Sequence, residues 1–93
     1  MMKDIVEVKI KDSLNSSLEM NSAASSFFDY INNFSEDVIK INFADVIFIS
    51  RSFAQEYIHQ KIKTKKIIEE FNLSEDVAPI LEIVENSFKN AET

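Results

Sequence analysis

The residues whose types and spacing could support chemistry lie in one short segment, where a predicted strand passes directly into a predicted helix. Ser50, Arg51 and Ser52 place two hydroxyl groups and one guanidinium at the start of that helix. A helix N-terminus has unpaired N–H groups and a partial positive charge, so it can bind a phosphate or a carboxylate. The exposed side of the helix continues this polar surface. We therefore predict a partner-binding surface made of Ser50, Arg51, Ser52, Gln55, Glu56 and His59.

Simpler structural roles also account for several of these residues. Ser52 and Gln55 have the spacing of a capping box, in which each side chain accepts a hydrogen bond from the other residue's backbone N–H. Ser50 and Ser52 are also the two candidate phosphorylation sites, because a phosphate suits a helix start. Arg51 is either an exposed surface residue or an anchor for a partner. The only histidine, His59, has no obvious catalytic neighbour in the sequence, so we expect it at the surface.

Composition excludes several classes of function. The 93-residue chain has 10 Lys and Arg against 16 Asp and Glu, a net charge of −6, which is unsuited to binding nucleic acid through its phosphates. Without glycine, the chain cannot build the Gly-rich loops that hold nucleotide phosphates. Without cysteine, it has no disulfide and no thiolate zinc site. We predict a protein that is not an enzyme, with no catalytic residue, no metal site and no cofactor.

Length and hydrophobicity predict one domain over residues 1–93. The N-terminus leads into an alternating segment and not into an apolar one, so no signal peptide is evident. The longest apolar-rich run, residues 38–49, contains Lys40, Asn42 and Asp45 and is too short to span a bilayer. The absence of cysteine suits a reducing compartment. We therefore expect a cytoplasmic protein that does not bind a membrane.

Alternating or continuous apolar residues give five segments strand character. These are residues 5–10, 17–20, 38–43, 46–49 and 66–73, of which 17–20 has the weakest pattern. Residues 46–49 are nearly all apolar, as in a strand covered on both faces, and a turn at Ala44 and Asp45 precedes them. In the last strand, Ile67, Ile68 and Phe71 are expected to be buried.

Apolar residues spaced three and four apart predict three helices. They cover residues 22–34, a segment starting near Ser52, and the C-terminal segment, with Pro79 in the first turn of the last helix. The expected caps are Asn21 or Ser22, Ser52, and Ser74 or Asp76. The expected buried stripes are Ala24, Phe27, Phe28, Ile31 and Phe34; Phe53, Ala54, Tyr57, Ile58 and Ile62; and Val77, Ile80, Leu81, Val84 and Phe88. Lysines at the end of the second helix are expected in solvent.

This order of elements favours an α/β fold. We predict a small mixed sheet of about four strands, with the helices packed mainly on one face.

The string Asn42 to Ala54, NFADVIFISRSFA, resembles the STAS family, the domain of anti-sigma-factor antagonists and of sulfate-transporter tails. It is most similar to a STAS-like branch of prokaryotic proteins with the string Asp or Asn, Phe, small, x, Val, x, Phe, Ile, Ser, x, Ser, Phe, Ala. A second string, FNLS at residues 71–74, also matches, just before the final helix. The resemblance implies a STAS-like domain over residues 1–93.

The resemblance also implies a non-enzymatic regulator that docks a protein partner, such as a kinase-like ATPase regulator, through residues 49–59. In the better-known branch, a partner kinase phosphorylates a serine in an Asp-Ser-Ser-Gly string, and this controls docking to an anti-sigma factor. Here Ser50 replaces the aspartate, Arg51 takes the usual phosphoserine position, and Phe53 replaces the glycine. A phosphate would therefore have to be on Ser50 or Ser52.

The alternative is a structural or oligomerisation module, or a subunit of a larger complex. Eight phenylalanines and a small sheet would give such a module an exposed apolar face for a homodimer.

Overall fold

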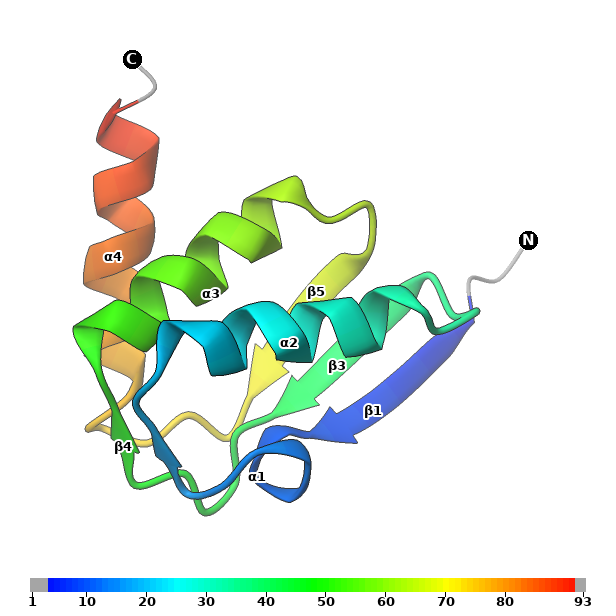
Figure 1. The fold of residues 1–93 in the computed structure, drawn as a ribbon, viewed down its shortest axis with the longest axis horizontal. Helices are drawn as coiled ribbons and strands as arrows, with labels where there is room; N and C mark the ends of the chain where they lie inside the picture. Colours follow the sequence, from blue (N-terminus) through cyan, green and yellow to red (C-terminus); the bar gives the residue numbers. More distant parts are fainter. Residues whose placement is uncertain (1–3, 92–93) are drawn as a thin grey trace.

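The structure, a computed structural model, describes residues 4–91 of the chain, which contain both strands and helices. The strands are β1 (Ile5–Lys9), β2 (Ser17–Leu18), β3 (Val38–Asn42), β4 (Phe48–Ile49) and β5 (Ile67–Phe71). The helices are α1 (Ile10–Ser13), α2 (Asn21–Asn32), α3 (Arg51–Lys63) and α4 (Ala78–Ala91). The central sheet has the strand order β1-β3-β5, and β2 pairs with β4 in a second sheet (Figure 1).

The α/β class is confirmed, but the predicted sheet is wrong. Instead of one mixed sheet of about four strands, residues 4–91 form five strands in two sheets, and every strand pair is parallel. The connections explain the direction, because α2 lies between β1 and β3, and α3 lies between β3 and β5. A helix between two strands returns the chain to the same end of the sheet, so the next strand runs parallel.

A tight turn explains why β4 leaves the central sheet. The Val46 N–H donates to the Phe43 carbonyl at 3.1 Å, and Asp45 between them has a φ of 65°. The chain then runs beside β2, where the Ile47 N–H donates to the Ser16 carbonyl at 2.9 Å. The predicted turn is thus confirmed, and the strand after it is shorter than predicted.

The central sheet has one face covered by helices and one face without a helix. Val8 and Ile41 belong to the core, on the face over which α2 and α3 lie (Figure 1). On the opposite face, the strand register aligns Glu7, Lys40 and Glu69 in one row. Helix α4 packs against α3 and stands beside the sheet.

Four apolar side chains that the sequence pattern places in the core are exposed. Ile47 and Phe48 lie at β4, which pairs only with β2 and is not covered on both faces. Ile62 is 50% exposed in the last turn of α3. Ile67 is 41% exposed because its register places it on the helix-free side of an edge strand.

The first predicted helix is confirmed as α2, with a different start. Its N-cap residue is Met20, not Asn21 or Ser22, and no side chain caps it. The buried side chains of α2 are those of the predicted stripe, namely Ala24, Phe27, Phe28 and Ile31.

The last predicted helix is confirmed as α4, and Pro79 lies in its first turn. Neither Ser74 nor Asp76 directly precedes α4, which begins at Ala78. The Ser74 carbonyl accepts hydrogen bonds from the Val77 N–H at 3.1 Å and the Ala78 N–H at 2.9 Å, but its buried hydroxyl forms no hydrogen bond and so caps nothing.

Asp45→Ala should lower the free energy of unfolding by about 1 kcal/mol, because alanine lacks the short polar side chain that lets aspartate tolerate a left-handed backbone. Asp45→Gly should cost less, since glycine has no Cβ. Both substitutions remove the 3.5 Å ion pair with Lys9, so they differ only in backbone preference. Urea unfolding of the two variants measures the difference, and equal losses would assign the effect to the ion pair.

Candidate functional site

Ser50 is the N-cap residue of α3. Its Oγ accepts a hydrogen bond from the Phe53 N–H at 3.0 Å and donates one to the Glu19 carbonyl at 2.6 Å. The predicted capping box of Ser52 and Gln55 is therefore wrong, because the helix begins before Ser52. The Ser50 hydroxyl ties the start of α3 to the segment between β2 and α2.

A groove of about 360 Å³ lies between α3, α4 and the first residue of α2. Its lining residues are Arg51, Ser52, Gln55, Glu56 and His59 from α3, Val84, Ser87 and Phe88 from α4, and Asn21 from α2. Five of the six residues of the predicted partner-binding surface thus line one groove. The sixth, Ser50, is half-buried and is not part of the lining.

The polar groups of the groove differ in how far they are already paired. The Glu56 carboxylate accepts a hydrogen bond from the Gln60 amide at 2.7 Å. The exposed Arg51 has no ion-pair partner among residues 4–91. The exposed His59 ring lies 6.2 Å from the Phe88 ring, measured between centroids. The groove therefore offers an available cation at one end and an aromatic pair at the other.

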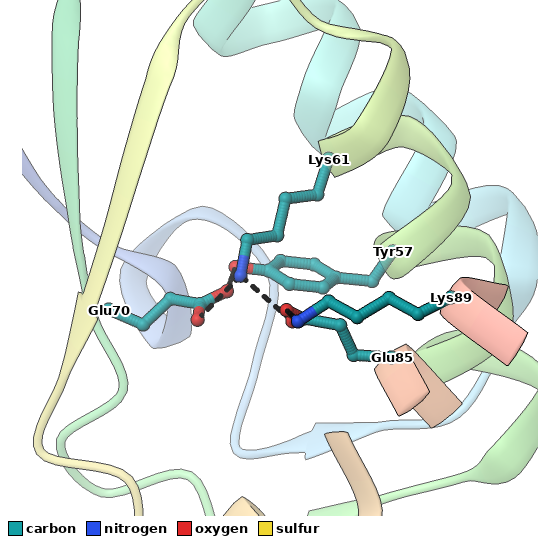
Figure 2. Close-up of polar contacts among 5 residues, drawn as sticks. All are labelled: Tyr57, Lys61, Glu70, Glu85 and Lys89. Carbon is teal, nitrogen blue, oxygen red and sulfur yellow. Dashed lines mark hydrogen bonds and ion pairs between the residues drawn. The ribbon is translucent and has the colours of Figure 1, made fainter. Parts of the chain in front are cut away.

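A second polar cluster, which the sequence analysis missed, joins α3, β5 and α4 (Figure 2). The Tyr57 hydroxyl donates to Glu70 Oε2 at 2.5 Å. Lys61 Nζ lies between two carboxylates, 3.1 Å from Glu70 Oε1 and 3.1 Å from Glu85 Oε1. Lys89 Nζ lies 3.4 Å from the other oxygen of Glu85. These five residues are called the Tyr57 cluster below.

The Tyr57 cluster shifts the pKa values of three of its members. Burial, and then the negative charge of Glu70, raise the pKa of Tyr57 well above its ordinary value of 10.0. Burial alone would lower the pKa of Lys61, but the Glu70 and Glu85 carboxylates outweigh burial and raise it. Burial alone would raise the pKa of Glu85, but Lys61 and Lys89 outweigh it and lower that pKa. The neutral Tyr57 and the charged side chains of Lys61, Glu70 and Glu85 thus link α3 to β5 and to α4.

The sequence carries only a weak signal for this cluster. Tyr57 and Lys61 are four residues apart and so share one side of α3. The hydrophobic pattern nevertheless assigns Tyr57 to the apolar stripe and Lys61 to a solvated helix end. Glu70 interrupts the apolar alternation of β5, and only the register beside Ile41 places it on the helix-covered face.

Two further findings concern residues 4–91. They contain no group of three or more His, Cys, Asp or Glu residues that could hold a metal ion. They also contain no helix long and apolar enough to cross a membrane.

Comparisons of the chain with protein-family models, with curated proteins and with solved structures find no match. The resemblance to STAS domains therefore rests on two strings, a long one from Asn42 to Ala54 and a short one at residues 71–74. In the structure, the long string runs from the end of β3 through β4 into the first turn of α3. The string thus includes Ser50, the N-cap residue of α3, and Arg51 and Ser52 at one end of the groove.

Ser50→Ala should lower the free energy of unfolding by about 1 kcal/mol, the usual loss for removing a capping hydroxyl. Ser52→Ala removes an exposed hydroxyl at the second position of the same helix and should cost only a few tenths of a kcal/mol. Urea denaturation followed by circular dichroism measures both. A larger loss for Ser52→Ala than for Ser50→Ala would indicate that Ser52 caps the helix, as the capping box predicted.

Glu85→Gln should destabilise the protein most at neutral pH. Because the pKa of Glu85 is lowered in the folded state, its contribution to stability is present above the ordinary value of 4.5 and is lost as the pH falls below it. The stability difference between wild type and Glu85→Gln should therefore shrink on acidification. Urea unfolding at a series of pH values measures it.

Glu82→Gln is the matched control, because it removes the same charge from an exposed position on the same helix. A Glu85→Gln difference that does not change with pH, or an equal pH dependence in Glu82→Gln, would contradict the role given to the ion pair with Lys61.

Proposed function

We propose that this chain is a regulatory protein-interaction domain without catalytic activity, and that a partner protein docks in the groove between α3 and α4. The observation that carries the proposal is the lining of that groove. Residues that the sequence pattern predicted to be exposed on α3 meet the apolar side chains of α4 there, so the groove combines polar and apolar contacts. This combination is typical of protein interfaces, in which Arg and aromatic residues are enriched.

The arrangement of the groove favours docking over catalysis. Its lining contains two hydroxyls, Ser52 and Ser87, and one imidazole, His59. Ser52 lies roughly 10 Å from His59 along α3, because the two are seven positions apart. Ser87 is on α4, and within residues 4–91 the His59 ring contacts Phe88 and forms no hydrogen bond with either serine. A general base must lie within hydrogen-bond reach of its nucleophile, so the groove presents no formed catalytic pair.

A regulatory role is supported by the resemblance to STAS domains, in which a serine in this segment carries the switch. Within this proposal, Ser52 is a better phosphate acceptor than Ser50. The Ser50 hydroxyl is half-buried and bonded on both sides, to Phe53 and Glu19, whereas Ser52 is exposed. A phosphate on Ser52 would lie in the first turn of α3 beside Arg51, where the helix dipole favours negative charge. A kinase-like ATPase regulator is the class of partner that would add it.

Self-association is the alternative, and it would use the helix-free face of the central sheet. That face exposes Ile5 and Ile67, which could meet a second copy. Its middle row, however, alternates Glu7, Lys40 and Glu69. A row of alternating charges is well suited to solvent and costly to bury. Docking of a partner in the groove is therefore better supported than self-association through the sheet.

Arg51→Ala and His59→Ala should each reduce the amount of partner recovered in pull-downs from source cells, by about fivefold or more if these residues are hot spots. Lys65→Ala is the control, since it removes a cation from an exposed position in the loop after α3. Circular dichroism verifies that the variants are folded. Recovery of the partner at the wild-type level by both groove variants would overturn the docking site.

A further inference from the structure

The groove lies beside two helix starts whose first turns carry no acidic residue. Helices α2 and α3 both begin beside it, since Asn21 and Arg51 are lining residues. Neither helix has an acidic residue in its first turn, although the chain contains 16 Asp and Glu. The partial positive charge of both helix starts is therefore not offset by neighbouring carboxylates of the first turn. Figure 1 shows the two helix starts side by side, close to α4.

The groove lining contains one basic residue, Arg51, and one acidic residue, Glu56, and they differ in how far they are already paired. Arg51 is exposed and has no ion-pair partner within residues 4–91, whereas the Glu56 carboxylate already accepts a hydrogen bond from Gln60. The side chains that α4 and α2 add to the lining carry no charge. A carboxylate of a partner protein can thus bind the Arg51 guanidinium through two parallel hydrogen bonds. It would not have to displace a carboxylate of residues 4–91 from Arg51.

The other end of the groove is suited to an apolar side chain. Val84 and Phe88 of α4 line it, and the Phe88 ring lies 6.2 Å from the His59 ring. From Arg51 to His59 the groove follows α3 for roughly 12 Å, the rise of eight helical residues. An extended peptide covers this length with about four residues. The groove is therefore long enough for one short segment.

We propose that the occupant is a short acidic segment of a partner protein, with a carboxylate bound by Arg51 and an apolar side chain packed against Phe88. This inference rests on the proposed docking function and adds the chemistry of the partner. It also assigns opposite effects to the two charges of the groove. Removing Arg51 weakens binding, and removing the negative charge of Glu56 strengthens it.

Selection of short random peptides displayed on phage, with the full chain as the target, tests this inference. The selected peptides should carry Asp or Glu near an aromatic or aliphatic residue. Labelled copies of these peptides, measured by fluorescence anisotropy, should bind Arg51→Ala about tenfold more weakly and Glu56→Gln more tightly than wild type. Lys65→Ala makes the same change in net charge as Arg51→Ala but leaves the groove intact, so it should bind like wild type.

Several results would overturn the inference. These are selection of basic or uncharged peptides, equal weakening by Lys65→Ala and Arg51→Ala, or failure to select any peptide whose binding depends on Arg51. If the cellular partner still needs Arg51 and His59 for recovery while its docking segment lacks an acidic residue, the proposed function stands and only this inference fails. If neither the peptides nor the cellular partner depends on the groove, both fail.

Discussion

The burial of Tyr57 is the constraint on which most of the fold depends. Its ring is fully buried and lies 5.2 Å from Phe28 and 5.9 Å from Phe43, between centroids, so it joins α2 and the end of β3 to α3. A buried hydroxyl without a partner costs about 1–3 kcal/mol, and Glu70 is the acceptor that removes this cost. The partly buried carboxylate of Glu70 is in turn compensated by Lys61.

The same cluster connects the central sheet to α4, because Lys61 also reaches Glu85. Helix α4 packs against α3, and the two helices are the main walls of the groove. The middle of α3 therefore holds the structure together, while the side of α3 that begins at Arg51 supplies the proposed docking surface. Placing a binding surface on a helix that is fixed by buried contacts keeps its side chains in a defined arrangement before a partner arrives.

Neighbouring residues at the start of α3 divide structure and function between them. The Ser50 hydroxyl is fully engaged by the backbone of α3 and of the segment before α2. Arg51 and Ser52 are exposed, and the groove begins with them. In the structure of a chain without glycine, the turns that lead to these elements use residues such as Asp45 and Asn72 in left-handed conformations.

Patterns within short stretches of chain were enough to find β1 and β3, the apolar faces of α2 and α4, and the turn at Asp45. These patterns also placed Arg51 and His59 on one surface, because the spacing of residues along a helix determines which of them share a side. No such pattern indicates which distant segments become neighbours. Hydrophobic periodicity gives the face of an element but not its partner, so the pairing of β4 with β2, the contact of Glu70 with Tyr57 and the closure of the groove by α4 arose from packing of the whole chain.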